Sequence, residues 1–249
     1  MITWTTGTVA APKRRCEESS YEDASRVGLD APQDRSFRAA ISDGATESAF
    51  ARLWATSLVD AFVNDSAWQQ RLDALAQAWA ANVWARDLPW NVQEKASQGA
   101  HASLLGVVIT ASHTEPWQTE RWHVHASIFG DSCFFVVDEA GVIDRAEPYQ
   151  RPEQFDARPY LLSTSPDHRQ RAIDRHLTRR ARLTNSQTLL LSTDAIGRWM
   201  LDALPSEIIE LSGIALDSNR SDFDDWLELH RSDGSLKDDD CTVVAISRQ

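Results

Sequence analysis

The spacing of apolar residues changes along the chain and predicts where strands and helices lie. Short apolar runs bounded by turn residues are typical of strands, and apolar residues three or four positions apart are typical of helices. Phe50, Trp54 and Leu58 have helical spacing, and Thr46 is a candidate cap for that helix. The predicted strands span residues 2–9, 22–27, 36–42, 102–112, 121–129, 132–138, 187–193 and 241–247. The predicted helices span 47–64, 67–85, 91–98 and 196–211, and the last of them is interrupted near Pro205.

The order of these elements favours one fold class. Strands follow strands with helices inserted between them, which indicates antiparallel sheets covered by helices and argues against a doubly wound parallel sheet. The two strands joined at Gly130 and Asp131 are predicted to form a hairpin. No linker divides the 249 residues, so we expect a single domain over residues 1–249.

Two segments differ in composition from the rest of the chain. Residues 147–184 contain several Pro and then a cluster of Arg, and we consider two interpretations, a solvated helical face and a flap that faces the substrate. Residues 217–240 are rich in Asp and are predicted to form an acidic loop.

Several short acidic motifs stand where an apolar run meets a turn. Asp43 follows the run at 37–42, Asp194 closes the run at 188–193, and Asp239 precedes the last predicted strand. Carboxylates at strand ends converge when the strands pack side by side, and they repel one another unless cations neutralise them. Because the candidate ligands are oxygen atoms, with no Cys or His beside them at ligand spacing, the pattern favours Mg²⁺ or Mn²⁺ over Zn²⁺.

In their order along the chain, these motifs resemble those of the metal-dependent serine/threonine protein phosphatases of type 2C, in their bacterial form. The resemblance begins at about residue 7 and covers nearly all of the chain. It implies a four-layer α-β-β-α sandwich of the α+β class, with two central, mainly antiparallel sheets flanked by helices. The motifs that carry it are Glu22-Asp23-Ala24, Ser42-Asp43-Gly44, Gly130-Asp131-Ser132, Ser192-Thr193-Asp194 and Asp239-Asp240-Cys241-Thr242.

The resemblance implies that two Mn²⁺ or Mg²⁺ ions are bound tightly and activate the water that attacks phosphoserine or phosphothreonine. Asp43 would bridge the two ions as a catalytic residue, and Gly44 would contribute its carbonyl oxygen. Asp194 and Asp239 would bind one ion and Glu22 the other. An aspartate counted back three residues from Thr242 is the family ligand, so Asp239→Asn is expected to impair activity far more than Asp238→Asn or Asp240→Asn.

The resemblance also assigns roles outside this pair of ions. Asp23 would be a second catalytic residue that orients the attacking water, and Asp131 matches the ligand of a third, weaker ion. Arg198 stands where the family carries another acidic ligand, so we expect the third ion to be weak or absent. The family also carries an Arg four residues before its acidic pair to bind the substrate phosphate, but this chain has Glu18 there. Arg14 and Arg15 are the predicted substitutes.

Composition and charge limit the classes of partner that the chain can bind. A net charge of −12 argues against nucleic acid and against an anionic membrane, because both are bound by clustered Lys and Arg. No secretory signal and no apolar run long enough to span a membrane is found, and an odd number of cysteines at unrelated spacings predicts free thiols. We therefore expect a cytoplasmic protein that acts on a phosphoprotein, with a serine/threonine kinase of the same pathway as a candidate partner.

Other interpretations of the same residues stay open. Asp43 before Gly44 is also typical of a turn, Asp194 of a helix cap, and residues 238–240 of a solvated loop. The missing Arg and the altered motif at Arg198 favour a rival function, a catalytically weak type 2C-like regulator or a phosphoprotein-binding module.

Overall fold

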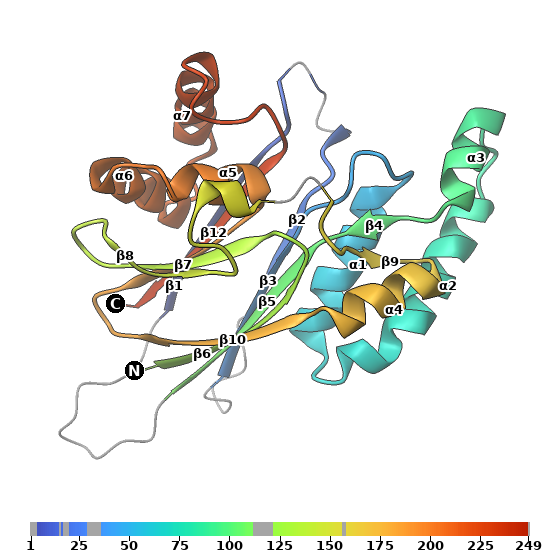
Figure 1. The fold of residues 1–249 in the computed structure, drawn as a ribbon, viewed down its shortest axis with the longest axis horizontal. Coiled ribbons are helices and arrows are strands. Elements are labelled where there is room, and N and C mark those ends of the chain that lie inside the picture. The colour runs from blue at the N-terminus through green and yellow to red at the C-terminus, as the bar shows by residue number, and fades with distance from the viewer. Residues whose placement is uncertain are drawn as a thin grey trace.

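Two five-stranded sheets pack face to face between layers of helices (Figure 1). The computed structural model describes residues 4–14, 16, 20–28, 36–111, 122–155 and 158–248. Within each of the two sheets, every pair of neighbouring strands is antiparallel. This arrangement confirms the predicted α-β-β-α sandwich of the α+β class.

The two sheets draw their strands from distant parts of the chain. The first sheet has the order β1 (Trp4–Ala11), β12 (Cys241–Arg248), β11 (Thr188–Ser192), β7 (Cys133–Val137) and β8 (Ile143–Glu147). The second has the order β10 (Leu177–Leu183), β6 (Trp122–Phe129), β5 (Leu104–Ala111), β3 (Ser36–Ser42) and β2 (Ala24–Gly28). A small third pair joins β4 (His101–Ala102) to β9 (Leu162–Ser163).

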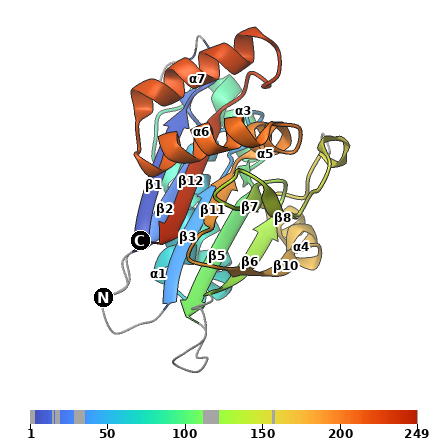
Figure 2. The same cartoon turned by 90° about the vertical axis from the view of Figure 1, so that its left-hand side faces the viewer.

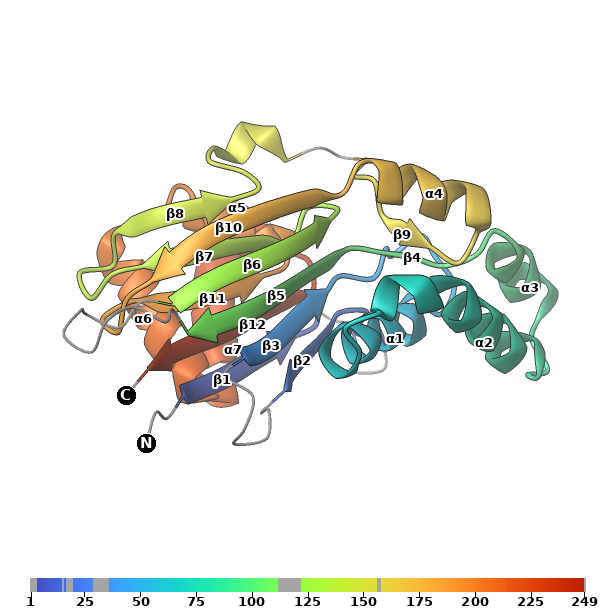
Figure 3. The same cartoon turned by 90° about the horizontal axis from the view of Figure 1, so that it is seen from below.

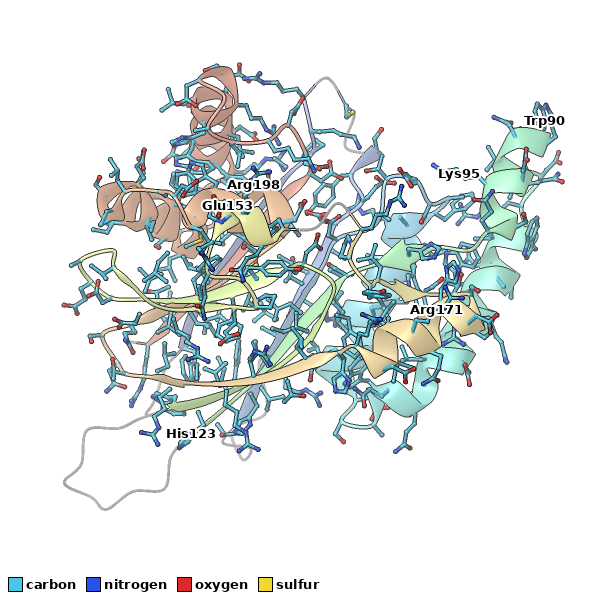
Figure 4. The ribbon with its side chains drawn as sticks, in the orientation of Figure 1. Trp90, Lys95, His123, Glu153, Arg171 and Arg198 are labelled. Atoms are coloured by element: carbon cyan, nitrogen blue, oxygen red, sulfur yellow. The ribbon has the colours of Figure 1, made fainter. Side chains whose placement is uncertain are left out.

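Alternate residues of the strands fill the space between the sheets. Val124 and Ile128 of β6 are buried there against Phe134 of β7. His123 and His125 stand on either side of Val124 in the sequence and therefore face outward, as Figure 4 shows for His123. Each fully buried side chain of this size contributes about 1.5–3 kcal/mol, so the alternation determines which face of each strand points inward.

Helices cover the outer faces of both sheets. α1 (Ala51–Asn64) lies against β2, β3 and β5 (Figure 3), and Trp54, Leu58 and Phe62 form its buried face. α6 (Pro205–Leu216) and α7 (Arg220–Ser232) lie over β1 on the opposite side (Figure 2). The remaining helical segments are η2 (Trp68–Arg71), α2 (Leu72–Trp84), α3 (Trp90–Ser97), η3 (Pro152–Gln154), α4 (Pro166–Asp174) and α5 (Asp194–Met200). In the part of the chain that is described, none of the helices combines the length and apolar character that crossing a membrane requires.

The predicted hairpin at Gly130 and Asp131 is wrong. β6 pairs with β5 and β10, whereas β7 pairs with β11 and β8 in the other sheet. The chain thus passes from one sheet to the other at Gly130, whose φ of +90° is in the region that favours glycine. Two apolar strands joined by a tight turn give the same sequence pattern whether they pair or stack, which is why the hairpin prediction failed.

Three local predictions also need correction. Residues 217–240 are not simply an acidic loop, because they contain α7, whose buried Phe223, Trp226 and Leu227 anchor it to the sheet. The Arg cluster of the segment 147–184 is a helical face only in part, because Arg171 is exposed on α4 whereas Arg180 lies in strand β10. Thr46 does not cap α1, which begins at Ala51.

Candidate active site

Acidic residues from both sheets gather at one end of the sandwich. Asp23 precedes β2 and Asp43 follows β3 in one sheet, while Asp194 follows β11 in the other sheet and begins α5. Asp131 lies in the crossing between β6 and β7. The negative charges of Asp23, Asp194 and Asp131 all act on Asp43. The structure therefore brings together four of the residues that the sequence predicted.

Burial and mutual repulsion raise the pKa of these carboxyl groups. Burial is the main cause at Asp43, whose pKa lies well above its usual range, and the three neighbouring charges add to it. The pKa of Asp131 rises to about 7, first because the group is buried and then because of the charge on Asp194. A bound cation would stabilise carboxylates held together in this way.

Two hydroxyl groups hold Asp23 in place. Thr242 Oγ1 donates a hydrogen bond to Asp23 Oδ2 at 2.7 Å, and the Tyr21 hydroxyl contacts the same Thr242 oxygen. Asp23 is buried, which is the main reason that its pKa is raised. Its other oxygen, Oδ1, has no hydrogen-bond partner among the described residues. A buried carboxylate oxygen without a hydrogen bond destabilises the folded protein unless a cation or a water molecule binds to it.

Backbone packing fixes the loop that carries Asp43 and Gly44. Ser103 Oγ accepts a hydrogen bond from the Asp43 N–H at 2.9 Å, and the Ser103 N–H donates to the Asp43 carbonyl at 2.8 Å. A Cβ on Gly44 would lie only 2.6 Å from the carbonyl oxygen of Glu22. Only glycine therefore allows this loop to approach the loop of Glu22 so closely.

Glu22 is positioned by Asp240, a residue that the sequence did not single out as functional. Asp240 is buried, and its Oδ2 accepts a hydrogen bond from the Glu22 N–H at 2.7 Å while its Oδ1 accepts one from the Lys13 N–H at 2.9 Å. Burial raises the pKa of Glu22. Within the described stretches no donor hydrogen-bonds to the buried Oε2 of Glu22, and the Lys13 ammonium lies 3.9 Å away.

Lys237 provides a cation that contacts two of the predicted metal ligands. Its Nζ lies 2.6 Å from Asp239 Oδ2 and 3.5 Å from Asp194 Oδ2. Burial lowers the pKa of Lys237, but the hydrogen bond to Asp239 and the charge of Asp194 outweigh burial and raise it overall. Lys237 was not predicted from the sequence, and its position two residues before Asp239 was the available signal.

The arginines predicted to bind phosphate are placed elsewhere or are not described. Arg14 forms a two-point ion pair with Glu228 of α7, with N···O distances of 3.1 and 2.9 Å. Arg15 and Glu18 lie outside the described residues. Arg198 is exposed on α5 (Figure 4) and lines a cavity of about 520 Å³ that Lys237 also lines.

The donor set fits a divalent cation, although the carboxylates are not yet arranged around one. In the stretches of chain that are described, no three Asp, Glu, His or Cys side chains stand together as a ready metal site. Asp23 Oδ1 and Glu22 Oε2, which accept no hydrogen bond within the described residues, and the repulsion around Asp43 are what a cation would satisfy. All of these donors are hard oxygen atoms, which suit Mg²⁺ and Mn²⁺.

Solved structures share this arrangement of elements over almost their whole length. The serine-threonine phosphatase 2C from Toxoplasma gondii is 12% identical, with a TM-score of 0.55, over 100% of this chain and 95% of that chain. The Mycobacterium tuberculosis serine/threonine phosphatase PstP/Ppp is 13% identical, with a TM-score of 0.56, over 99% of each chain. RsbX, in complex with magnesium, is 16% identical, with a TM-score of 0.51, over 100% of each chain. The chain has the fold of the type 2C phosphatases. No protein-family model and no curated protein matches the sequence.

The type 2C fold confirms the resemblance that the five motifs predicted from the sequence. The fold explains how motifs far apart in the sequence can form one site, because the two sheets bring their strand ends to the same end of the sandwich. The individual ligand roles of Asp43, Asp131, Asp194 and Asp239 stay predictions. Lys237 lies outside the type 2C motifs, and Asp240 lies in the last of them but was given no role from the sequence.

Proposed function

We propose that the chain is a metal-dependent phosphoprotein phosphatase that hydrolyses phosphoserine and phosphothreonine. The observation that carries the proposal is the group of carboxylates Asp23, Asp43, Asp131 and Asp194, whose mutual repulsion calls for cations. The type 2C fold supports it, because two of the similar solved structures are serine/threonine phosphatases. A phosphoprotein is the substrate class, and a kinase of the same pathway is a candidate partner.

The residues at this site would hold two ions of Mg²⁺ or Mn²⁺. Asp43 would contact both ions, with Asp194, Asp239, Glu22 and the Gly44 carbonyl as further ligands. Asp131 would hold a weak third ion. Such ions lower the pKa of a bound water and neutralise the charge of the phosphoryl group. RsbX was solved in complex with magnesium, which supports this class of cation.

Asp23 is suited to orient the attacking water and to take its proton. The Asp43 carboxyl interacts with Asp23, and no N–H or hydroxyl group within the described residues donates to Asp23 Oδ1. That oxygen can therefore accept the proton while Thr242 fixes the other one. The Tyr21 hydroxyl in turn holds Thr242. A base within hydrogen-bond reach of the water, in a buried and fixed orientation, is the arrangement that general base catalysis requires.

The substrate phosphate still needs a cationic partner from this chain. Arg14 would have to leave Glu228 to reach it, so Arg14 and Arg15 stay predicted phosphate ligands. We also propose a cytoplasmic location, which the three free thiols support, with Cys133 and Cys241 buried.

A catalytically weak, phosphoprotein-binding regulator is the second candidate function. One observation favours it: Lys237 already contacts Asp194 and Asp239, the two proposed ligands of one ion. A regulator of this kind would bind phosphopeptides without turning them over.

Hydrolysis of p-nitrophenyl phosphate and of a phosphothreonine peptide, with Mn²⁺ or with EDTA, separates the two functions. We expect turnover that requires Mn²⁺ and that Asp43→Ala reduces by at least about a hundredfold, about 2.7 kcal/mol of transition-state stabilisation. Asp238→Asn is the matched control, because it removes one acidic charge near the site without removing a proposed ligand. Turnover that persists in EDTA would contradict the proposal, and peptide binding without turnover would favour the regulator.

A further inference from the structure

Lys237 bridges two parts of the chain that meet only in the folded protein. Asp194 begins α5 after strand β11, and Asp239 precedes strand β12. The ammonium group of Lys237 makes ion pairs with both, at 3.5 Å and 2.6 Å. It therefore takes up carboxylate oxygens that a divalent ion would also need.

We propose that Lys237 is a resident cation that competes with a divalent metal ion for Asp194 and Asp239, and so sets the metal affinity of this half of the site. The inference rests on the proposed function, since it takes both carboxylates as metal ligands. Metal binding would then require the ammonium group to move away from both oxygens. Its positive charge would otherwise stand beside the ion and repel it.

The surroundings of Lys237 allow that movement. Its side chain is 56% exposed, so the ammonium group can be rehydrated when it leaves the carboxylates. It also lines the cavity of about 520 Å³, where Asp202 and Glu207 offer other carboxylates. An ion pair this exposed is worth up to about 1 kcal/mol, which a divalent ion held by several carboxylates exceeds.

Lys95 offers a matched comparison within the same protein. It reaches from α3 to the carbonyl oxygen of Thr46, at 3.0 Å, and its positive charge acts on Glu22. Figure 4 shows it on α3, well apart from Arg198 on α5. Removal of Lys95 changes the net charge as much as removal of Lys237, but frees no proposed ligand.

Calorimetric titration of the metal-free protein with Mn²⁺ tests the inference without any activity measurement. For Lys237→Met we expect an affinity for Mn²⁺ about tenfold higher than that of the unmodified chain. The ion no longer has to displace two ion pairs and is no longer repelled by the ammonium group, and these effects add. Lys237→Gln should behave in the same way and provides a second neutral variant if the first one folds poorly. Lys237→Arg keeps a positive charge beside the carboxylates, and Lys95→Met leaves Lys237 in place. The affinity of both variants for Mn²⁺ should therefore stay within about twofold of that of the unmodified chain.

Each alternative outcome is decisive. Equal affinity in Lys237→Met, Lys237→Gln and the unmodified chain would overturn the inference and leave the proposed function standing. A lower affinity in both neutral variants would mean that Lys237 holds the ligands in position, which also overturns it. If no variant binds Mn²⁺, the inference fails together with the metal dependence of the proposed function. If Lys95→Met raised the affinity for Mn²⁺ as much as Lys237→Met, the effect would come from the change in net charge and not from competition for the two carboxylates, which would overturn the inference.

Discussion

The carboxylate of Asp240 accepts a hydrogen bond from the backbone N–H of Glu22 at 2.7 Å, although 218 positions separate the two residues. Its second oxygen accepts one from Lys13. The start of the last strand is thus tied to the loop that carries the acidic pair. Asp240 positions Glu22 through the backbone and is not itself a proposed ligand.

This hydrogen bond gives Asp240 a different predicted role from that of its neighbour Asp239. Asn at position 240 keeps only one acceptor oxygen, so one buried N–H loses its partner, at a cost of about 1–3 kcal/mol. We expect Asp240→Asn to lower the free energy of unfolding by that amount in the metal-free protein. Asp239→Asn should leave the free energy of unfolding nearly unchanged and weaken Mn²⁺ binding. Urea unfolding in EDTA and calorimetry with Mn²⁺ measure the two effects.

The expectation drawn from the sequence, that Asp240→Asn and Asp238→Asn change activity far less than Asp239→Asn does, stays a prediction, and the hydrogen bonds of Asp240 add a predicted loss of stability for Asp240→Asn. Asp238→Asn should have a smaller effect on stability than Asp240→Asn, because the Asp238 side chain is exposed, although its Oδ1 accepts a hydrogen bond from the Arg14 N–H at 2.8 Å and lies 3.7 Å from Arg231 Nε. If Asp240→Asn unfolds at the same urea concentration as the unmodified chain, the two backbone hydrogen bonds contribute nothing and the positioning role is refuted.

Some parts of the site could be predicted from the sequence because their signals are local. Asp43 and Asp194 each follow an apolar run that becomes a strand, and strand ends meet at one end of a sheet. α1 was found, although its start was placed too early, because Trp54 and Leu58 recur at helical spacing on a buried face. The strands and the helix could be predicted from the next few residues along the chain, whereas the ligand roles of Asp43 and Asp194 were predicted from the order of all five motifs.

Other parts depend on contacts that no local pattern contains. Whether β6 and β7 pair or stack is decided by β10 and β11, which come much later in the sequence. α7 has buried residues at 223, 226, 227 and 230, a helical spacing, but its many acidic residues suggested a loop. Asp240 and Lys237 act on residues far away in the sequence, so their roles emerge only when the sheets assemble.

Thr242→Val tests the support of the proposed base. Val has nearly the same shape as Thr but lacks the hydroxyl that donates to Asp23 Oδ2 at 2.7 Å. We expect turnover to fall by about tenfold or more, because the base loses its fixed orientation, while the affinity for Mn²⁺ changes little. Tyr21→Phe is the milder control, since it removes only the contact behind Thr242. An unchanged turnover number in Thr242→Val would rule out this role.

Arg198→Asp tests why a third ion should be weak. Arg198 lies four residues after Asp194 on α5, so the two side chains share one face of the helix. A carboxylate at this position would add a ligand and remove a positive charge, so we expect a third Mn²⁺ near Asp131. Anomalous scattering at the manganese edge from crystals of both proteins provides the measurement. A fully occupied third site in the unmodified chain would contradict the repulsion attributed to Arg198.

The stability of the metal-free protein should fall as the pH rises. Asp131 has a usual pKa of 3.8 that folding raises to about 7, and the pKa values of Asp43 and Asp194 are raised as well. A carboxyl group with a raised pKa binds more protons in the folded state, so its contribution to stability is complete below the unfolded pKa and is lost as the pH rises through the folded one. In EDTA we expect a lower Tm at about pH 8 than at about pH 5, and Mn²⁺ should reverse most of the loss at the higher pH.

Asp131→Asn provides the matched control for this pH dependence. Asn keeps the shape of the side chain and cannot ionise, so the fall in Tm between pH 4 and about pH 7 should become shallower. The decrease should not vanish, because the pKa of Asp43 stays raised by burial and by the charges of Asp23 and Asp194. A Tm in EDTA that rises with pH over this range would mean that the carboxylates do not repel one another in the folded chain, and the case for a cation at this end of the sandwich would fail with it.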